Sequence, residues 1–189
     1  MKREVLIKVK GIQSMEGRDD AEEPVELVIP GIYERDEEVS RLFYEERMDE
    51  LDETPTMNVV EFTGQSLTVH KTGLVNVDMV FEPGKMNIAF YETPYGILDM
   101  GISTVGLYVK NEEDLIEIRA DYSLSMNGEF VADCMIGITA EPRNSQGSGS
   151  KKRVKKDILG KGMSFFMRYY FLFFFGLYFF FVALFTLAF

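Results

Sequence analysis

Residues 73–110 read GLVNVDMVFEPGKMNIAFYETPYGILDMGISTVGLYVK, and this stretch decides the fold. Apolar and polar side chains alternate from Val75 to Phe81, and a second alternating run extends over residues 87–92. A period of two residues is typical of a β-strand with one dry face. Pro83-Gly84 and Thr93-Pro94-Tyr95-Gly96 suit tight turns, because proline fixes φ and glycine accepts positive φ. The stretch therefore predicts two hairpins joined as a meander.

The segments on either side show the same alternation. They are residues 5–11, 25–29, 39–48, 59–63, 67–71, 116–124 and 130–140. Asn127-Gly128 separates the last two, and this dipeptide favours a type I′ hairpin turn because both of its positions accept positive φ. About eight to ten short strands in meander order can close into a barrel, which removes exposed sheet edges. We therefore predict an all-β fold, a closed antiparallel meander barrel.

Several residues of the same stretch form a family-like pattern. They are Gly73, Phe81-Glu82, Gly84, Tyr91-Glu92-Thr93-Pro94-Tyr95-Gly96, Leu98, Gly101 and Thr104. With this spacing the pattern resembles the YwiB-like family, small calycin-like β-barrel proteins of Gram-positive bacteria that form a domain of unknown function. The resemblance covers about residues 2–142. It implies a lipocalin-like barrel and brings no established substrate or catalytic residue with it.

The composition of the chain changes sharply near Asn144. Residues 1–150 hold 13 basic and 30 acidic side chains, a formal charge of −17, whereas residues 151–189 carry +6. We therefore divide the chain into a barrel domain, residues 1–142, a Gly/Ser and basic linker, residues 143–168, and a hydrophobic C-terminal helix, residues 169–189.

Residues 169–189 are long and apolar enough to predict a transmembrane helix. These 21 residues include no charged side chain, and at about 1.5 Å per residue they would span roughly 30 Å of hydrocarbon. All seven basic residues of 151–189 precede the segment, so the positive-inside rule places the barrel in the cytoplasm. This reading makes the chain a tail-anchored, single-pass membrane protein.

A second origin of this tail stays open. Eleven of the 16 phenylalanines lie between Phe165 and Phe189. T-rich and A-rich DNA encodes phenylalanine and lysine. A frameshift near Asn144 would therefore also produce a segment rich in these two residues. The resemblance to the family ends near Pro142, which fits that alternative.

Charge and cysteine content exclude some partners for the barrel. A domain this acidic repels phosphate backbones, so we expect no nucleic-acid binding. Cys134 is the only cysteine, which excludes an intrachain disulfide and indicates a reducing compartment. Its phase with Ala132 and Ile136 predicts a small buried side chain. No apolar run of signal-peptide length follows Met1.

The residues that usually carry catalysis form no recognisable set. His70 is the only histidine, and its neighbours suggest an exposed strand position. The acids between Glu16 and Glu53 lack the spacing of a calcium loop, so we interpret them as a solvated rim. We therefore expect no metal, no cofactor and no enzymatic activity.

Two functions remain for such a barrel. The first is a binding module whose lumen or rim takes a small apolar ligand, since barrel mouths are recurrent ligand sites. Its candidate ligand-binding residues are Tyr91, Thr93, Tyr95, Arg119 and Tyr122. Arg119 would partner a buried tyrosine only if its strand face is the inner one. The alternative is a structural or protein-interaction barrel with a filled lumen and an acidic surface.

The tail yields a testable prediction. The full chain is expected to partition with membranes, whereas a version ending at Pro142 is expected to stay in the soluble fraction. Each Phe, Leu or Val at the bilayer centre favours insertion by about 0.3–0.6 kcal/mol, and no charged residue opposes that sum. Cell fractionation with a carbonate wash tests this, and a full-length chain that washes off the pellet contradicts the anchor.

Overall fold

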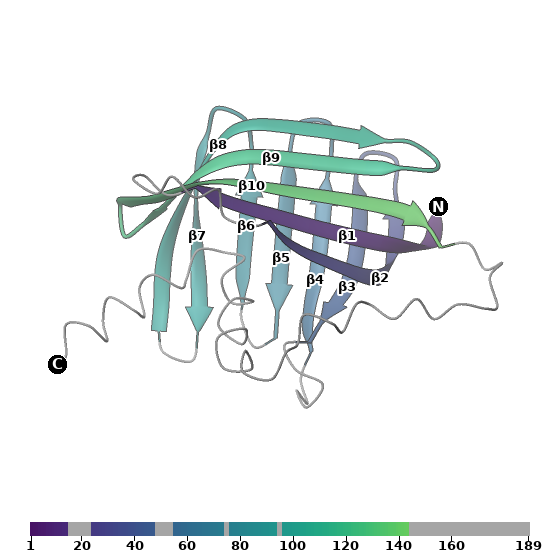
Figure 1. Ribbon diagram of the computed structural model, residues 1–189, viewed down its shortest axis with the longest axis horizontal. Helices are drawn as coiled ribbons and strands as arrows, with labels where there is room; N and C mark the ends of the chain where they lie inside the picture. Colours follow the sequence, from purple (N-terminus) through teal and green to yellow (C-terminus); the bar gives the residue numbers. More distant parts are fainter. Residues whose placement is uncertain (15–23, 48–54, 74–75, 94–95, 144–189) are drawn as a thin grey trace. The chain divides into compact units, whose positions relative to one another are not determined.

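The computed structural model describes residues 1–14, 24–47, 55–73, 76–93 and 96–143, all of which belong to one compact unit. Within these ranges ten strands form one antiparallel sheet (Figure 1). Their bounds are β1 Lys2–Ser14, β2 Val25–Arg35, β3 Ser40–Glu46, β4 Thr56–Phe62, β5 Leu67–Thr72, β6 Val77–Phe81, β7 Met86–Thr93, β8 Gly96–Asn111, β9 Ile116–Met126 and β10 Glu129–Pro142. The predicted all-β class is confirmed.

The predicted C-terminal helix is not tested by these strands. None of the described ranges includes a helix long and apolar enough to cross a bilayer. Residues 169–189 and most of the linker lie outside those ranges, so the transmembrane helix stays a prediction.

The order of the strands around the sheet is β6-β5-β4-β3-β2-β1-β10-β9-β8-β7. The ladder between β1 and β10 runs from Val5 opposite Pro142 to Ser14 opposite Asp133, and it joins the two halves of the chain. The two edge strands, β6 and β7, share a single isolated bridge between Asn76 and Glu92. The barrel is therefore nearly closed, and the prediction of a fully closed meander is wrong between β6 and β7.

The hydrogen bonds of β7 and of the turn before it run mainly to β8. β7 pairs with β8 along its whole length, from Met86 to Thr93. The turn between β6 and β7 also bonds to β8, since the Gly84 N–H donates to the Thr104 carbonyl (2.9 Å) and the Thr104 N–H donates to the Lys85 carbonyl (3.0 Å). Pairing with β8 uses one edge of β7, and the other edge, which faces β6, makes the isolated bridge at Glu92.

The strands cross in two layers. Figure 1 shows β3 to β7 upright, while β1, β9 and β10 run across them. β2 and β8 are the corners, because each pairs in both layers: β2 pairs with β3 only over Gly31–Arg35, and β8 pairs with β7 only up to Ser103. At the first corner a Cβ on Gly31 would overlap the Ile7 side chain and lie 2.6 Å from the Phe43 carbonyl oxygen. Glycine permits this close approach.

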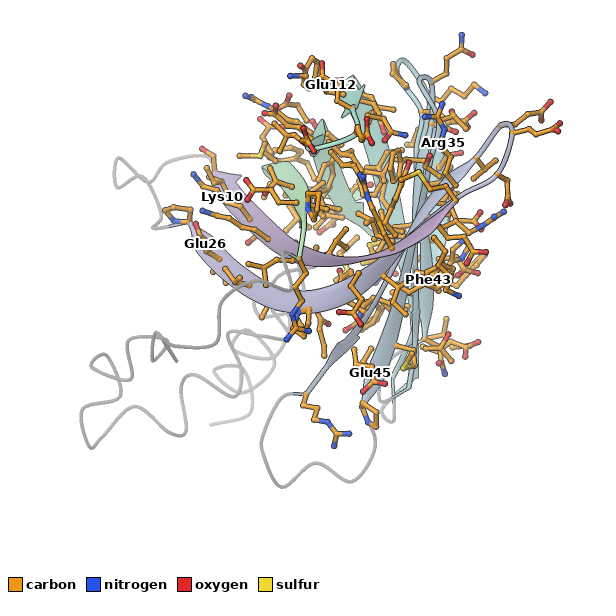
Figure 2. All side chains as sticks on the ribbon, turned by 90° about the vertical axis from the view of Figure 1, so that its right-hand side faces the viewer. Lys10, Glu26, Arg35, Phe43, Glu45 and Glu112 are labelled. Atoms are coloured by element: carbon orange, nitrogen blue, oxygen red, sulfur yellow. The ribbon has the colours of Figure 1, made fainter. Side chains whose placement is uncertain are left out.

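Side chains fill the space between the layers (Figure 2). Along β9 every second residue is buried, from Ile116 to Met126, as the alternation predicts. The Phe81 and Tyr122 rings meet edge to face, with centroids 5.0 Å apart. Cys134 is a free, buried cysteine, which confirms its predicted environment. The inner faces therefore form a packed core of the kind expected in small barrels.

Two of the predicted turns have the backbone geometry that their residues favour. Gly84 has a φ of 75°, and the Lys85 N–H donates to the Glu82 carbonyl (3.1 Å). Asn127 and Gly128 have φ values of 48° and 84°, as a type I′ turn requires.

A polar network at one end of the barrel connects opposite walls. The Tyr33 hydroxyl, on β2, donates to Asn111 Oδ1 at the end of β8 (3.0 Å). Asn111 Nδ2 donates to Ser40 Oγ, on β3 (2.9 Å). Arg35 and Glu112, next to these residues, lie at one end in Figure 2, and Glu45 lies at the other. We call these the upper and lower ends.

Replacing Asn111 tests this closure of the upper end. Asn111→Ala leaves Ser40 and Tyr33 without their amide partner, so we expect a loss of about 1–3 kcal/mol in the free energy of unfolding. Urea unfolding of the variant, compared with Glu113→Ala on the same turn, measures the effect. Equal stability of the two variants would show that the network does not hold the walls together.

Candidate functional site

The structure disperses the ligand-binding residues predicted from the sequence. Tyr91 and Tyr122 point inward and are only 3% and 7% exposed. Arg119 lies on the outer face of β9, where its guanidinium binds Asp121 (2.8 Å). Arg119 therefore does not partner a buried tyrosine.

Thr93 is the last residue of β7, and its backbone pairs with Gly96. Its side chain and all of Tyr95 lie outside the described structure. Of the five predicted residues, Tyr91 is the one that leads to a site.

The gap between β6 and β7 forms a hollow of about 410 Å³. Its lining comes from β5, β6 and β7 and consists of Lys71, Thr72, Asn76, Val77, Asp78, Ile88, Ala89, Phe90 and Glu92. Three of these residues, Lys71, Val77 and Ala89, are buried on the inner face, while the others are exposed. Because successive side chains of a strand point to opposite faces, the lining includes residues from both faces of the wall. We call it the seam hollow.

The backbone beside the seam hollow forms no regular ladder. Asn76 and Glu92 exchange two hydrogen bonds at its lower end (3.0 and 3.4 Å). By the alternation of an antiparallel pair, the backbone groups of Asp78, Ile88 and Phe90 also point into the gap. At the upper end Asn87 Nδ2 donates to the Val80 carbonyl (3.3 Å), where a ladder bond would otherwise form.

A row of inward side chains lies behind the seam hollow. Tyr44 on β3 pairs with Asn58 on β4, Asn58 pairs with Lys71 on β5, and Lys71 pairs with Val77 on β6. Neighbours in such a row have Cβ atoms about 4.5–5.5 Å apart. Polar groups from three strands therefore gather on the inner face near the lower end.

Lys71 forms a nearly buried ion pair with Glu46. The distance from Lys71 Nζ to Glu46 Oε2 is 2.8 Å, and the two side chains are only 10% and 12% exposed. Burial lowers the pKa of Lys71, although the charge and the hydrogen bond of Glu46 act against that effect. The pair thus holds an ammonium group where the protein disfavours its charge.

Two tyrosines share this environment. Burial, with a smaller contribution from the charge of Glu46, raises the pKa of Tyr91 to about 12. The same two causes raise the pKa of Tyr44 further. Both phenols therefore stay protonated at neutral pH, beside the carboxylate.

Asn58 adds an unsatisfied acceptor to the cluster. Its Nδ2 donates to the Thr56 carbonyl (3.2 Å), whereas its fully buried Oδ1 has no hydrogen-bond partner. A buried acceptor of this kind is costly unless a donor reaches it. It stands next to Lys71 in the cross-strand row.

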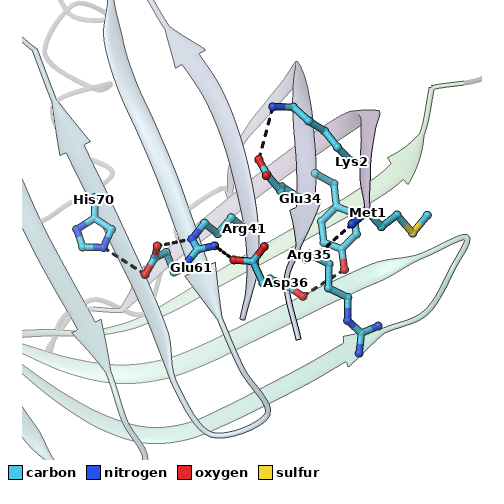
Figure 3. A network of polar contacts seen from close by, with 10 residues as sticks. Met1, Lys2, Glu34, Arg35, Asp36, Arg41, Glu61 and His70 are labelled. Carbon is cyan, nitrogen blue, oxygen red and sulfur yellow. Dashed lines mark hydrogen bonds and ion pairs between the residues drawn. The ribbon is translucent and has the colours of Figure 1, made fainter. Parts of the chain in front are cut away.

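His70 lies on the outer face, as its neighbours suggest. Figure 3 shows it in a chain of contacts with Glu61, Arg41 and Asp36. His70 Nδ1 is 2.7 Å from Asp78 Oδ1, which links this surface network to the rim of the seam hollow. Among the residues that the structure describes, no group of three His, Cys, Asp or Glu side chains could hold a metal ion.

The sequence contains a signal for the ion pair that our interpretation of the acids missed. Lys71 is in phase with Leu67 and Val69, and Glu46 is in phase with Leu42 and Tyr44. A charged residue that continues an apolar phase at the end of a strand indicates a buried charge. We interpreted all acids between Glu16 and Glu53 as a solvated rim, and for Glu46 this interpretation is wrong.

The sequence matches a known family over residues 7–138, described as Domain of unknown function (DUF1934). The chain belongs to this family. The resemblance found in the sequence is thereby confirmed, and the barrel described above is a DUF1934 domain.

Among solved structures, the crystal structure of the YwiB protein from Bacillus subtilis is similar to this chain. It is 22% identical, with a TM-score of 0.61, and the match covers 76% of this chain and 94% of that one. At this identity the likeness shows the fold of the DUF1934 domain. A comparison with curated proteins found no match.

The raised pKa of Tyr91 predicts how stability depends on alkaline pH. A phenol with a pKa of about 12 in the folded state and 10 in the unfolded chain contributes stability that is full below pH 10 and is lost as the pH rises toward 12. At pH 11 the loss amounts to about 1.4 kcal/mol.

Tyr91→Phe removes this contribution, so we expect its urea midpoint to fall less between pH 9 and pH 11 than that of the wild type. Tyr108→Phe is the control, because it removes an exposed phenol and so measures the effect of losing a titrating hydroxyl that is not buried. The same pH dependence in Tyr91→Phe and the wild type would contradict the buried environment of Tyr91.

Proposed function

We propose that this barrel is a non-enzymatic binding module for a small, mostly apolar molecule, and that the ligand occupies the seam hollow. The observation that supports this most directly is the hollow itself. Its volume of about 410 Å³ falls in the range of roughly 300–1,000 Å³ that is typical of small-molecule pockets. The packed core leaves this lateral route as the way toward the interior.

The lining of the seam hollow suggests which parts of the ligand are apolar and which are polar. Ile88 and Phe90 present exposed apolar side chains on the outer side, and Val77 and Ala89 present buried ones on the inner side. Ligand pockets typically combine such apolar walls with a few polar groups that fix orientation. Here the polar groups are Lys71 on the inner face, the backbone that faces the gap, and the exposed side chains of Thr72, Asn76, Asp78 and Glu92.

The charge of the rim limits the ligand further. Asp78 and Glu92 are exposed on the outer side of the hollow, and the barrel as a whole is strongly acidic. Like charges repel, and an anion would lose hydration on entry. We therefore propose a neutral or cationic ligand with an apolar body.

The proposal includes the cellular setting predicted from the sequence. The barrel faces the cytoplasm, residues 169–189 tether it to a membrane, and nucleic acid is not a partner. A ligand that partitions into bilayers would reach a tethered barrel at high local concentration.

A second function is supported by the packed core and by one exposed stripe. Met86, Ile88 and Phe90 project from the outer face of β7 and are all at least 60% exposed. Exposed apolar patches often mark protein contacts. A structural or protein-interaction barrel would use this stripe without filling the hollow.

Photolabelling of the full chain, held in amphipol, tests the proposed ligand site. We expect a diazirine derivative of benzyl alcohol to label residues 76–92, and excess benzyl alcohol to compete with it. Ile88→Ser removes part of the apolar wall and with it about 1 kcal/mol of binding free energy. The Kd for benzyl alcohol should therefore rise about fivefold.

Ile97→Ser is the matched control, because Ile97 is as exposed as Ile88, 63% against 61%, but does not line the hollow. Its Kd is expected to match that of the wild type. Labelling spread evenly over the chain, or equal Kd values for the two variants, would refute the site and leave the interaction barrel as the better account.

A further inference from the structure

Lys71 is the one amine that lines the seam hollow, among the residues that the structure describes. It reaches the hollow from the inner face of β5, whereas Thr72, next to it in the chain, is exposed. A molecule in the seam hollow therefore lies next to Lys71. Lys85, by comparison, projects from a turn with 63% of its side chain exposed.

The surroundings of Lys71 suit a nucleophilic amine. An amine attacks a carbonyl carbon only in its neutral form, and desolvation in an apolar pocket is a recognised way to favour that form. Burial does this for Lys71, as its lowered pKa indicates. The Glu46 carboxylate, 2.8 Å away, is within reach to accept a proton from the ammonium group.

We propose that Lys71 binds a carbonyl ligand, an aldehyde or a ketone, by forming a reversible imine in the seam hollow. This inference rests on the proposed function, because it names the chemical class of the ligand at the same site.

The reaction balances without any oxidant or reductant. Glu46 takes one proton from the Lys71 ammonium, and the neutral nitrogen attacks the carbonyl carbon. A C–N bond forms while the π pair of the C=O bond moves to the oxygen, and a proton then passes from the attacking nitrogen to that oxygen, which becomes a hydroxyl. Glu46 then returns its proton to that hydroxyl, which leaves as water while the nitrogen lone pair forms the C=N bond. Hydrolysis reverses each step, so the ligand is bound and released unchanged.

The other groups of the cluster support the intermediate. The carbinolamine that precedes the imine has a hydroxyl group, and Asn58 Oδ1, the buried acceptor without a partner, stands next to Lys71 in the cross-strand row. Tyr91 stays protonated, so it is a donor and not a competing charge. The acidic rim formed by Asp78 and Glu92 favours a neutral carbonyl compound over one with a carboxylate or phosphate.

Reductive trapping of the full chain tests the proposal. The protein in amphipol is treated at neutral pH with benzaldehyde and sodium cyanoborohydride, which converts an imine into a stable benzylamine, and peptides are quantified by mass spectrometry. We expect Lys71 to be modified faster than Lys85, because burial lowers the pKa of Lys71 and so raises the share of its amine that is neutral. Excess benzyl alcohol should slow the reaction at Lys71 and not at Lys85.

Two comparisons complete the experiment. With para-carboxybenzaldehyde the preference for Lys71 over Lys85 should fall, since the acidic rim repels the carboxylate. Lys71→Arg should lose the trapped product near the hollow, because a guanidinium group does not form the imine. If this variant fails to fold, the ratio of Lys71 to Lys85 in the wild type decides.

The outcomes separate the two proposals. Modification of Lys71 no faster than that of Lys85, with photolabelling still confined to the hollow, would overturn imine formation and leave the binding function. Failure of both the trapping and the photolabelling would overturn both.

Discussion

The pairing of β1 with β10 is the interaction on which the rest of this barrel depends. It is a ladder from Val5–Pro142 to Ser14–Asp133, and it joins a six-stranded half, β1 to β6, to a four-stranded half, β7 to β10. Loop closure over this sequence distance costs conformational entropy, which the long ladder and the buried faces of both strands must offset. Once it forms, the two halves face each other and the core can pack between them.

The pairing of β1 with β10 also determines where the barrel stays open. With β1 and β10 joined, the remaining edges are β6 and β7, which a short turn already connects. An ordinary hairpin would pair them, yet their described residues share a single bridge, and the turn between them bonds to Thr104 on β8. The unpaired edges enclose the seam hollow, and one residue of its lining, Lys71, pairs with the nearly buried Glu46. A buried ion pair rarely adds to stability, so its position invites a functional explanation.

Local sequence patterns predict much of this fold. Some features depend only on residues that are close in the sequence. Examples are the alternation from Ile116 to Leu124 and the turns at Pro83-Gly84 and Asn127-Gly128. The gap between β6 and β7 has no such signal. Pro83-Gly84 favours a hairpin there, and the hydrogen bonds of this turn to Thr104 on β8 are non-local contacts that the local pattern does not report.

The candidate site divides in the same way. The inward direction of Lys71 can be read from its phase with Leu67 and Val69, whereas the alternation around Tyr91 does not give its direction, because the apolar Ile88 and Phe90 lie in the opposite phase. The partner of Lys71 cannot be predicted from such a phase, because Glu46 lies on another strand and the register between the strands decides their contact. Arg119 shows the limit of residue type alone: a charged side chain near buried tyrosines in sequence points to the opposite face of the sheet.

The open seam is the central claim, and amide hydrogen exchange measured residue by residue tests it most directly. Along β7 the amides of Ala89 and Tyr91 point to β8 and should be protected, whereas those of Ile88 and Phe90 point into the gap and should exchange much faster. This alternation is the predicted result. Equal protection of all four amides would mean that β6 and β7 form a regular ladder, that the barrel is closed and that the seam hollow does not exist in solution.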